Sequence, residues 1–165
     1  MLEAILDELR QEAGTTKRVL EAVPGNKLTW KPHSRSMSLG QLAIHVATIP
    51  GNISRLVQLD GFDVATAKFE PEQPKSAEAI LSAFEDSMAT AEAYLSRLDE
   101  AGASQPWRLT SKGKEISTLT RGGVIRSLMF NHWYHHRGQL SVYLRLLEVP
   151  VPSIYGPSAD DNPFT

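Results

Sequence analysis

Four stretches of the chain repeat apolar residues at the three- and four-residue spacing of a helix that buries one face. These stretches cover residues 2–23, 38–59, 76–99 and 120–147. Turn-forming residues separate them, including Pro24-Gly25-Asn26 after the first stretch and Pro150 after the last. The pattern predicts four long amphipathic helices that bury their apolar faces against one another as an all-α four-helix bundle.

The second stretch has a clear start and one interruption. Ser38 and Gln41 have the spacing of a capping box, in which each side chain bonds the backbone N–H of the other. Pro50 lies inside the stretch and lacks the N–H that would bond the carbonyl of Val46. We expect this helix to bend near its middle rather than to end there.

Two connections between the predicted helices are longer than simple turns. Residues 60–75 contain one glycine and two prolines, which indicates an exposed crossover. Between the third and fourth helices, side chains alternate around Lys112-Gly113-Lys114, a pattern typical of a short β-hairpin but also of a plain loop. After the fourth helix the tail is rich in turn formers, and Ile154 and Tyr155 could dock it on the bundle. Without repeats or an interdomain linker, we expect a single domain over residues 1–165.

Composition narrows the classes of function. Seventeen Lys and Arg oppose nineteen Asp and Glu, and a formal net charge of −2 gives no reason to expect a nucleic-acid partner. The absence of cysteine excludes disulfides, thiolate metal ligands and cysteine nucleophiles. The first residues carry acids where a secretory signal carries bases, and no apolar run approaches the roughly 18 residues of a membrane span. We therefore expect a cytoplasmic protein with no membrane partner.

Three of the five histidines cluster in the fourth helical stretch. At about 100° per residue, His132 and His136 share one helix face, whereas His135 points about 100° away from His136. Two imidazoles at i, i+4 can chelate one metal ion because both project from the same side, one turn apart. Histidines that face a bundle interior are also often hydrogen-bonded core residues, so this pair alone is a modest signal.

A metal site needs more donors than this pair provides, because zinc takes three or four nitrogen or oxygen ligands. His45, at the flank of the apolar face of the second helix, is the candidate for the third. Three neutral imidazoles leave at least one position for water, which is the arrangement of a catalytic site. His33 and His135 are expected at the surface.

Three segments resemble the DinB-like (DinB/YfiT) family of metal-binding four-helix bundle proteins. They are SMSLGQLAIHVA (36–47), NHWYHHRGQLSVYLR (131–145) and VPSIYGPSADD (151–161). The resemblance implies an up-down-down-up bundle whose metal is held by one histidine of the second helix and two of the fourth, here His45, His132 and His136. It also implies one divalent ion per chain, most often zinc or nickel, and a homodimer. Characterised relatives include thiol-dependent enzymes.

These observations favour a metal-dependent transferase or hydrolase that acts on a small molecule, with a low-molecular-weight thiol as a candidate reactant. The alternative is a non-catalytic stress-response bundle whose metal is structural and joins the second helix to the fourth. No general base is identifiable: Asp160 and Asp161 are candidates only if the tail folds over the site, and otherwise are solvated charges. Arg137 could bind an anionic substrate, although an exposed helix arginine is the more common outcome.

A third hypothesis makes the large aromatic side chains the walls of an apolar ligand pocket, although core packing is their more common role. The aromatics concerned are Trp30, Trp107, Trp133 and Tyr134. Trp133 lies about 60° from His136 around the helix and is the one expected to flank the metal.

Overall fold

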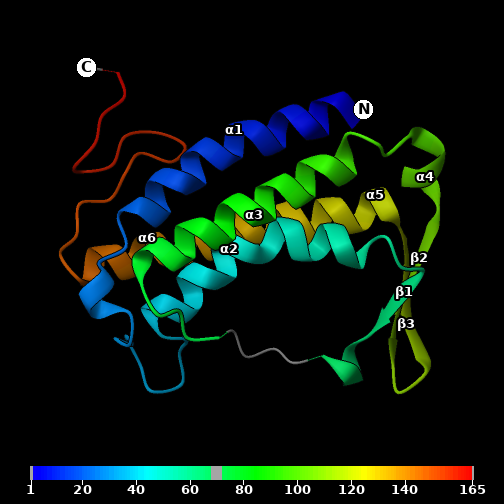
Figure 1. Ribbon diagram of the computed structural model, residues 1–165, viewed down its shortest axis with the longest axis horizontal. Helices are drawn as coiled ribbons and strands as arrows, with labels where there is room; N and C mark the ends of the chain where they lie inside the picture. Colours follow the sequence, from blue (N-terminus) through cyan, green and yellow to red (C-terminus); the bar gives the residue numbers. More distant parts are fainter. Residues whose placement is uncertain (1, 68–71, 165) are drawn as a thin grey trace.

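Four helical units run side by side along the long axis of the protein (Figure 1). The computed structural model describes residues 2–67 and 72–164. The units are α1 (Leu2–Glu21), α2 (Leu39–Leu56), α3 (Ala77–Leu95) and a fourth built from α5 (Arg121–Val124), η3 (Ile125–Asn131) and α6 (His132–Leu146). Their directions are up, down, down and up, which confirms the predicted topology. The fourth helix was predicted as one continuous α-helix, but η3 is a π-helical segment.

The ends of α2 and α3 follow from local capping. Ser38 and Gln41 form the predicted capping box, and the Ser76 side chain accepts a hydrogen bond from Ala79 at the start of α3. α2 continues through Pro50, as expected, and ends at Leu56 rather than at residue 59. α3 ends at Leu95, four residues earlier than predicted, and a short helix α4 (Glu100–Ser104) follows it.

α2 and α3 approach each other closely at Gly51. A Cβ atom at this position would lie 2.8 Å from the Cα atom of Ser87, so only glycine fits. The backbone N–H of Gly51 donates to the Ser87 hydroxyl over 2.8 Å. Gly51 therefore permits the backbones of the two parallel helices to pack directly against each other.

A small three-stranded sheet covers one end of the bundle (Figure 1). β2 (Pro106–Ser111) and β3 (Lys114–Thr120) form the antiparallel hairpin that the sequence left open, with Lys112 and Gly113 at positive φ in its turn. β1 (Gly61–Asp63) pairs with β2 in parallel. The sheet means that the fold is not a bundle alone.

The first part of residues 60–75, the segment predicted as an exposed crossover, has regular structure that was not predicted. This part forms β1 and a 3-10 turn, η2 (Val64–Thr66), and residues 68–71 lie outside the described part of the chain. The Asp63 carboxylate caps η2 and accepts hydrogen bonds from the backbone N–H groups of Lys112 and Gly113. Asp63 thus ties the connection to the turn of the hairpin.

The core lies between the four helical units and extends under the sheet through Trp107, which is 1% exposed. Its largest apolar side chains include Trp133, Phe130, Leu9, Leu20, Leu39, Leu42, Ile80, Ile125, Met129 and Leu140. None of the described helices is both long and apolar enough to cross a bilayer.

The C-terminal tail is irregular, as predicted, and is fastened to the bundle. Asp160 forms an ion pair with Arg145 of α6 and accepts a hydrogen bond from the backbone of Val151. Asp161 accepts one from the backbone of Ser153. These two carboxylates, considered as catalytic candidates or solvated charges, are exposed, do not join the three histidines, and hold the tail in place.

Candidate metal centre

The three histidines singled out in the sequence converge between α2 and α6. His45 projects from the first half of α2, and His132 and His136 project from the first turns of α6. A ligand atom of each lies within 4.8 Å of those of the other two, and the Nε2 atoms of His45 and His132 are 3.3 Å apart. The rings meet edge to face with centroids 4.5–5.1 Å apart. Helix geometry therefore correctly predicted that His132 and His136 lie together, and the family resemblance correctly added His45 to the group.

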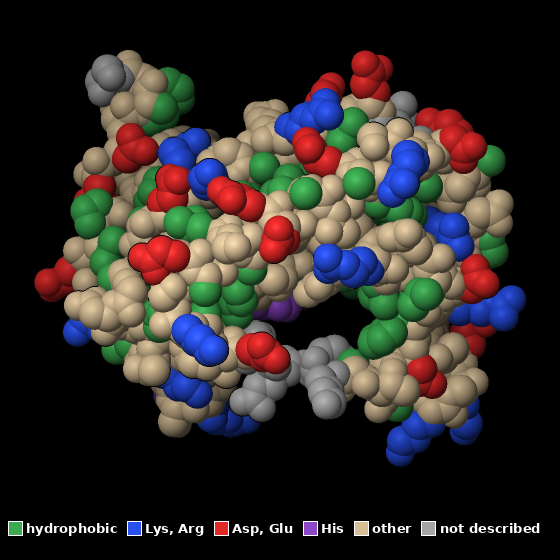
Figure 2. Space-filling view, viewed as in Figure 1, with side chains coloured by type: hydrophobic (Ala, Val, Ile, Leu, Met, Phe, Trp, Pro, Cys, Tyr) green, Lys and Arg blue, Asp and Glu red, His purple; other side chains and the backbone are tan. Residues whose placement is uncertain are grey.

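This spacing fits a divalent ion. Two imidazole nitrogens bound tetrahedrally to zinc, each about 2.05 Å from the ion, lie about 3.3 Å apart. The separation of the His45 and His132 Nε2 atoms is the same. Neutral imidazoles are also the usual protein ligands of zinc and nickel. Each of the three side chains is half-buried, and Figure 2 shows histidine surface inside a hollow of the face in view.

Burial keeps the three rings neutral. It lowers the pKa of His45 from 6.5 to about 4, with a smaller contribution from the neighbouring His136 and His132. Burial is also the main reason that the pKa of His132 and the pKa of His136 lie below 6.5. At neutral pH the imidazoles are unprotonated, so their lone pairs are available to a cation.

The rings of His136 and His132 are oriented by hydrogen bonds at their other nitrogens. The Nδ1 atom of His136 lies 2.7 Å from the Oε1 atom of Gln139, so the amide oxygen accepts the Nδ1 proton and Nε2 keeps its lone pair. The ring of His132 bonds the carbonyl of Leu128 in η3. The backbone N–H of His132 bonds Met129 rather than Leu128, which a regular α-helix would give it. The π-helical segment thus directly precedes the site and shapes it.

A buried hydrogen bond joins α2 to α6 beside the triad. The indole N–H of Trp133 donates to the carbonyl oxygen of Val46 over 2.9 Å. Val46 needs this donor because Pro50, its partner in the helical ladder, has no N–H. Trp133 is fully buried, with Phe84 beside it, so it packs in the core, as does Trp107. For Trp133 and Trp107, core packing is therefore the role observed, rather than the wall of a ligand pocket.

Arg137, expected to be either exposed or substrate-binding, is instead buried and paired. It is 1% exposed and forms an ion pair with Glu12 of α1 over 2.6 Å. It also donates to the hydroxyl groups of Thr16 and Tyr155, and its guanidinium contacts the rings of both Tyr134 and Tyr155. The interpretation as a surface residue was wrong, because burial here is offset by a full set of partners.

Glu12 is the polar residue that the sequence analysis missed. It is 8% exposed and, with the fully buried Thr16, continues the face of α1 that carries Leu9 and Val19. Two polar side chains in an otherwise apolar stripe were a signal of a buried polar partner. That partner is Arg137.

The remaining titratable candidates lie outside the triad. His33 and His135 are exposed, as predicted, and the Nδ1 atom of His33 accepts a hydrogen bond from the backbone of Arg35. Among residues 2–67 and 72–164, no Asp or Glu joins the three histidines in a metal-binding cluster. The described donors thus number three, all imidazoles.

Comparison with known proteins agrees with this fold. A family model described as the DinB family matches residues 1–162. An uncharacterised protein of Bacillus subtilis (strain 168), YrdA, is 27% identical over 160 residues, covering 97% of this chain and 91% of that protein. The solved structure of a DinB-like protein from Bacillus cereus ATCC 10987 superposes with a TM-score of 0.68 at 25% identity, covering 93% of this chain and 97% of that one. A DinB-like protein of Bacillus subtilis, YjoA, shares the fold with a TM-score of 0.67 at 16% identity, covering 96% and 98% of the two chains.

Proposed function

The chain belongs to the DinB family, and from this premise we propose that it binds one divalent metal ion through His45, His132 and His136. We further propose that the ion serves a transferase or hydrolase reaction on a small molecule, with a low-molecular-weight thiol as a candidate reactant. The observation that carries the proposal is the convergence of three neutral imidazoles from two helices, with ligand atoms within 4.8 Å of one another.

The donor set favours a reactive rather than a closed site. A structural zinc site has four protein ligands, whereas three ligands leave a position for a reactant. In the described part of the chain, no carboxylate stands close enough to complete the set. A zinc or nickel ion bound here supplies Lewis acidity, which lowers the pKa of a coordinated water or thiol toward neutrality. Gln139 and the Leu128 carbonyl hold the rings of His136 and His132 in the orientation that binding requires.

The rival proposal is a structural ion that joins α2 to α6 without turnover. Its support is that His45 and the other two histidines come from different helices. Two observations weigh against it. The Trp133–Val46 hydrogen bond already joins these helices next to the triad, and three donors fall short of the usual structural shell.

Metal content tests the ligand set. The protein is purified without added metal, and bound metal is measured for single alanine variants of His45, His132 and His136. Each should lose most of the roughly one ion per chain that the wild type carries. His33→Ala and His135→Ala are the matched controls and should retain it. Equal loss from His135→Ala, or full retention in any triad variant, contradicts the proposed ligands.

A cobalt-substituted sample separates the reactive from the structural ion. If a coordination position is open, an added small thiol changes the ligand-field bands of the cobalt. Bands that do not respond to thiols or to other small anions favour the structural ion. Thiol-transfer assays with several low-molecular-weight thiols, on wild type and His136→Ala in parallel, then test for turnover.

We also propose that the protein is a homodimer. Val142 and Leu146 on the outer face of α6 are each 56% exposed, and a second copy could cover them. Sedimentation at micromolar concentration should give a species of twice 18.2 kDa, and Val142→Glu should shift it toward the monomer. A single 18.2 kDa species for the wild type contradicts the dimer.

A further inference from the structure

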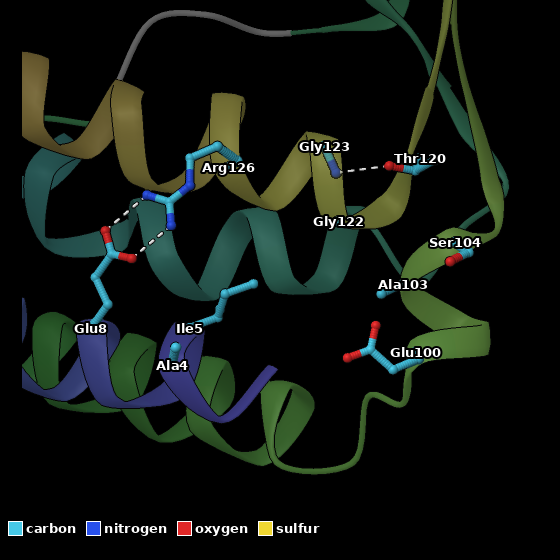
Figure 3. A pocket seen from close by; sticks show the side chains of 10 residues that line it. All are labelled: Ala4, Ile5, Glu8, Glu100, Ala103, Ser104, Thr120, Gly122, Gly123 and Arg126. Carbon is cyan, nitrogen blue, oxygen red and sulfur yellow. Dashed lines mark hydrogen bonds and ion pairs between the residues drawn. The ribbon is translucent and has the colours of Figure 1, made fainter. Parts of the chain in front are cut away.

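A cavity of about 510 Å³ lies between the first half of α1 and the α4–α5 region, and no residue of the histidine triad lines it (Figure 3). Its volume is within the range of roughly 300–1,000 Å³ that small-molecule sites occupy. Its lining residues also lie outside the three segments that resemble the DinB-like family. The metal centre therefore does not account for this cavity.

The cavity exists because small residues meet where the helices diverge. Ala4 of α1, Ala103 of α4, and Gly122 and Gly123 of α5 line it and extend no side chain beyond Cβ. Ile5 supplies the larger apolar surface from α1. The result is an apolar floor with room for a ligand of small organic size.

One side of the cavity is formed by an ion pair that is held in place from several directions. The Arg126 guanidinium donates to both carboxylate oxygens of Glu8, over 2.8 and 2.6 Å, and the Tyr134 hydroxyl donates to the same carboxylate over 2.7 Å. The guanidinium also lies over the ring of Phe130, 4.8 Å from its centroid. The Arg126 hydrogen bond keeps the pKa of Glu8 below its ordinary value, so the pair stays ionised and its charges cancel.

The polar part of the lining offers hydrogen-bond donors. A guanidinium has five N–H groups, and Glu8 takes two of those of Arg126. The Arg126 side chain is 45% exposed, so N–H groups beyond these two can meet a ligand. The hydroxyl oxygen of Thr120 accepts the backbone N–H of Gly123 over 3.0 Å, which leaves the hydroxyl proton as a second donor (Figure 3).

The same contacts disfavour a charged ligand of either sign. An anion would have to compete with Glu8, which already holds Arg126 through both carboxylate oxygens. An ammonium group would find both of these oxygens hydrogen-bonded, and Glu100, which also lines the cavity, is not free either. The lining therefore suits an uncharged group that accepts hydrogen bonds.

We propose that this cavity binds a small uncharged molecule that has an apolar body and a carbonyl group. The carbonyl oxygen accepts a hydrogen bond from the Arg126 guanidinium, and the body packs on Ile5, Ala4 and Ala103. A carbonyl fits a donor lining because it accepts hydrogen bonds and brings no donor that would need a partner of its own. A molecule of the same shape without the carbonyl gains the apolar contacts alone.

Probes of nearly one shape test the proposal: acetophenone has the carbonyl, ethylbenzene lacks it, 1-phenylethylamine is a cation and benzoate is an anion at neutral pH. Each is titrated into the full chain while backbone amide resonances are followed by NMR. Acetophenone should bind most tightly and should shift the amides of Ala103, Gly122 and Gly123. Arg126→Met should weaken acetophenone about fivefold, the effect of losing one hydrogen bond, and should leave ethylbenzene unchanged. Arg35→Met, outside the lining, is the matched control and should bind acetophenone as the wild type does.

A second variant fills the space. A Cβ atom at Gly122 would lie 3.4 Å from the carbonyl oxygen and 3.7 Å from the Cβ atom of Ala103, which is ordinary contact, so Gly122→Leu should fold. This variant should abolish the shifts caused by acetophenone, whereas Gly14→Leu, at an exposed position of α1, should not. Binding should be the same in His136→Ala, because the cavity is separate from the metal centre.

Three results overturn the proposal. The first is that ethylbenzene, 1-phenylethylamine or benzoate binds as tightly as acetophenone. The second is that the amide shifts map away from the cavity or persist in Gly122→Leu. The third is that Arg126→Met binds acetophenone as tightly as Arg35→Met does.

Discussion

The indole of Trp133 donates a hydrogen bond to the carbonyl oxygen of Val46, the acceptor that Pro50 leaves without its helical donor. Val46 follows His45 in the sequence, and Trp133 follows His132. The interruption of the α2 ladder is therefore used to fix the distance between the two helices that carry the histidines.

Trp133→Phe should weaken both the fold and the metal site. The change leaves the buried Val46 carbonyl without a donor, which costs about 1–3 kcal/mol of unfolding free energy. It also removes the hydrogen bond that fixes the distance between His45 and His132, so zinc affinity should fall. Urea unfolding and chelator competition measure the two effects. Trp107→Phe is the matched control: it should lower stability without lowering zinc affinity, and an equal loss of affinity in both variants contradicts the role of Trp133.

Gln139→Leu should reduce metal affinity about tenfold, at the lower end of the range for groups that support a ligand, because Gln139 is exposed. The leucine cannot accept the Nδ1 proton of His136, so the ring is no longer held with Nε2 toward the ion. Gln139→Glu keeps an accepting oxygen and should retain the affinity. If the leucine and glutamate variants bind zinc equally well, Gln139 has no such role.

Metal affinity should persist to lower pH than for ordinary histidines. Protons and the ion compete for the same lone pairs, so affinity falls as the pH drops through the pKa values of the metal-free rings. Burial lowers the pKa of His45 to about 4 and the pKa values of His132 and His136 below 6.5. The loss on acidification should therefore be centred below pH 6.5. Zinc competition titrations between pH 5 and pH 7.5 check this, and a midpoint at or above 6.5 contradicts it.

Arg137→Met should destabilise the protein by about 3–5 kcal/mol, because it leaves the Glu12 carboxylate buried without its partner. The double variant Glu12→Leu, Arg137→Met should be more stable than Arg137→Met alone, since no charge remains buried. The control is Lys17→Met, which removes an exposed ion pair with Glu85 and should cost at most about 1 kcal/mol. Thermal unfolding compares the three, and an equal cost for Arg137→Met and Lys17→Met rules out a stabilising role for the buried pair.

Features that follow from helical periodicity were predictable from the sequence. The four helices, the start of α2 at Ser38 and the pairing of His132 with His136 depend on local spacing and on which residues share a helix face, whereas His45 was added through the family resemblance. The spacing of the residues in the sequence determines which of them share a face. The same reasoning placed His135 at the surface, where the structure has it.

Features that depend on distant parts of the chain were not predictable. β1 has three residues, too few for an alternating pattern, and exists because β2 lies beside it. The π-helical η3 requires no particular residue type. The sequence therefore did not predict the altered backbone hydrogen bond of His132 or the bond of its ring to Leu128. Arg137 was misassigned because its partner Glu12 lies on another helix, 125 positions away.

The wide separation of Glu12 and Arg137 also sets an order of events during synthesis. α1 leaves the ribosome before α6, so the arginine that neutralises Glu12 follows 125 residues later, and Tyr155, which bonds both, follows 143 residues after Glu12. At a translation rate of about 5–20 residues per second, Arg137 is synthesised roughly 6–25 s after Glu12. Until then, the part of α1 around Glu12 and Thr16 cannot be buried without the cost of an unpaired charge. This part of α1 can therefore be buried with its charge paired only after α6 has been synthesised.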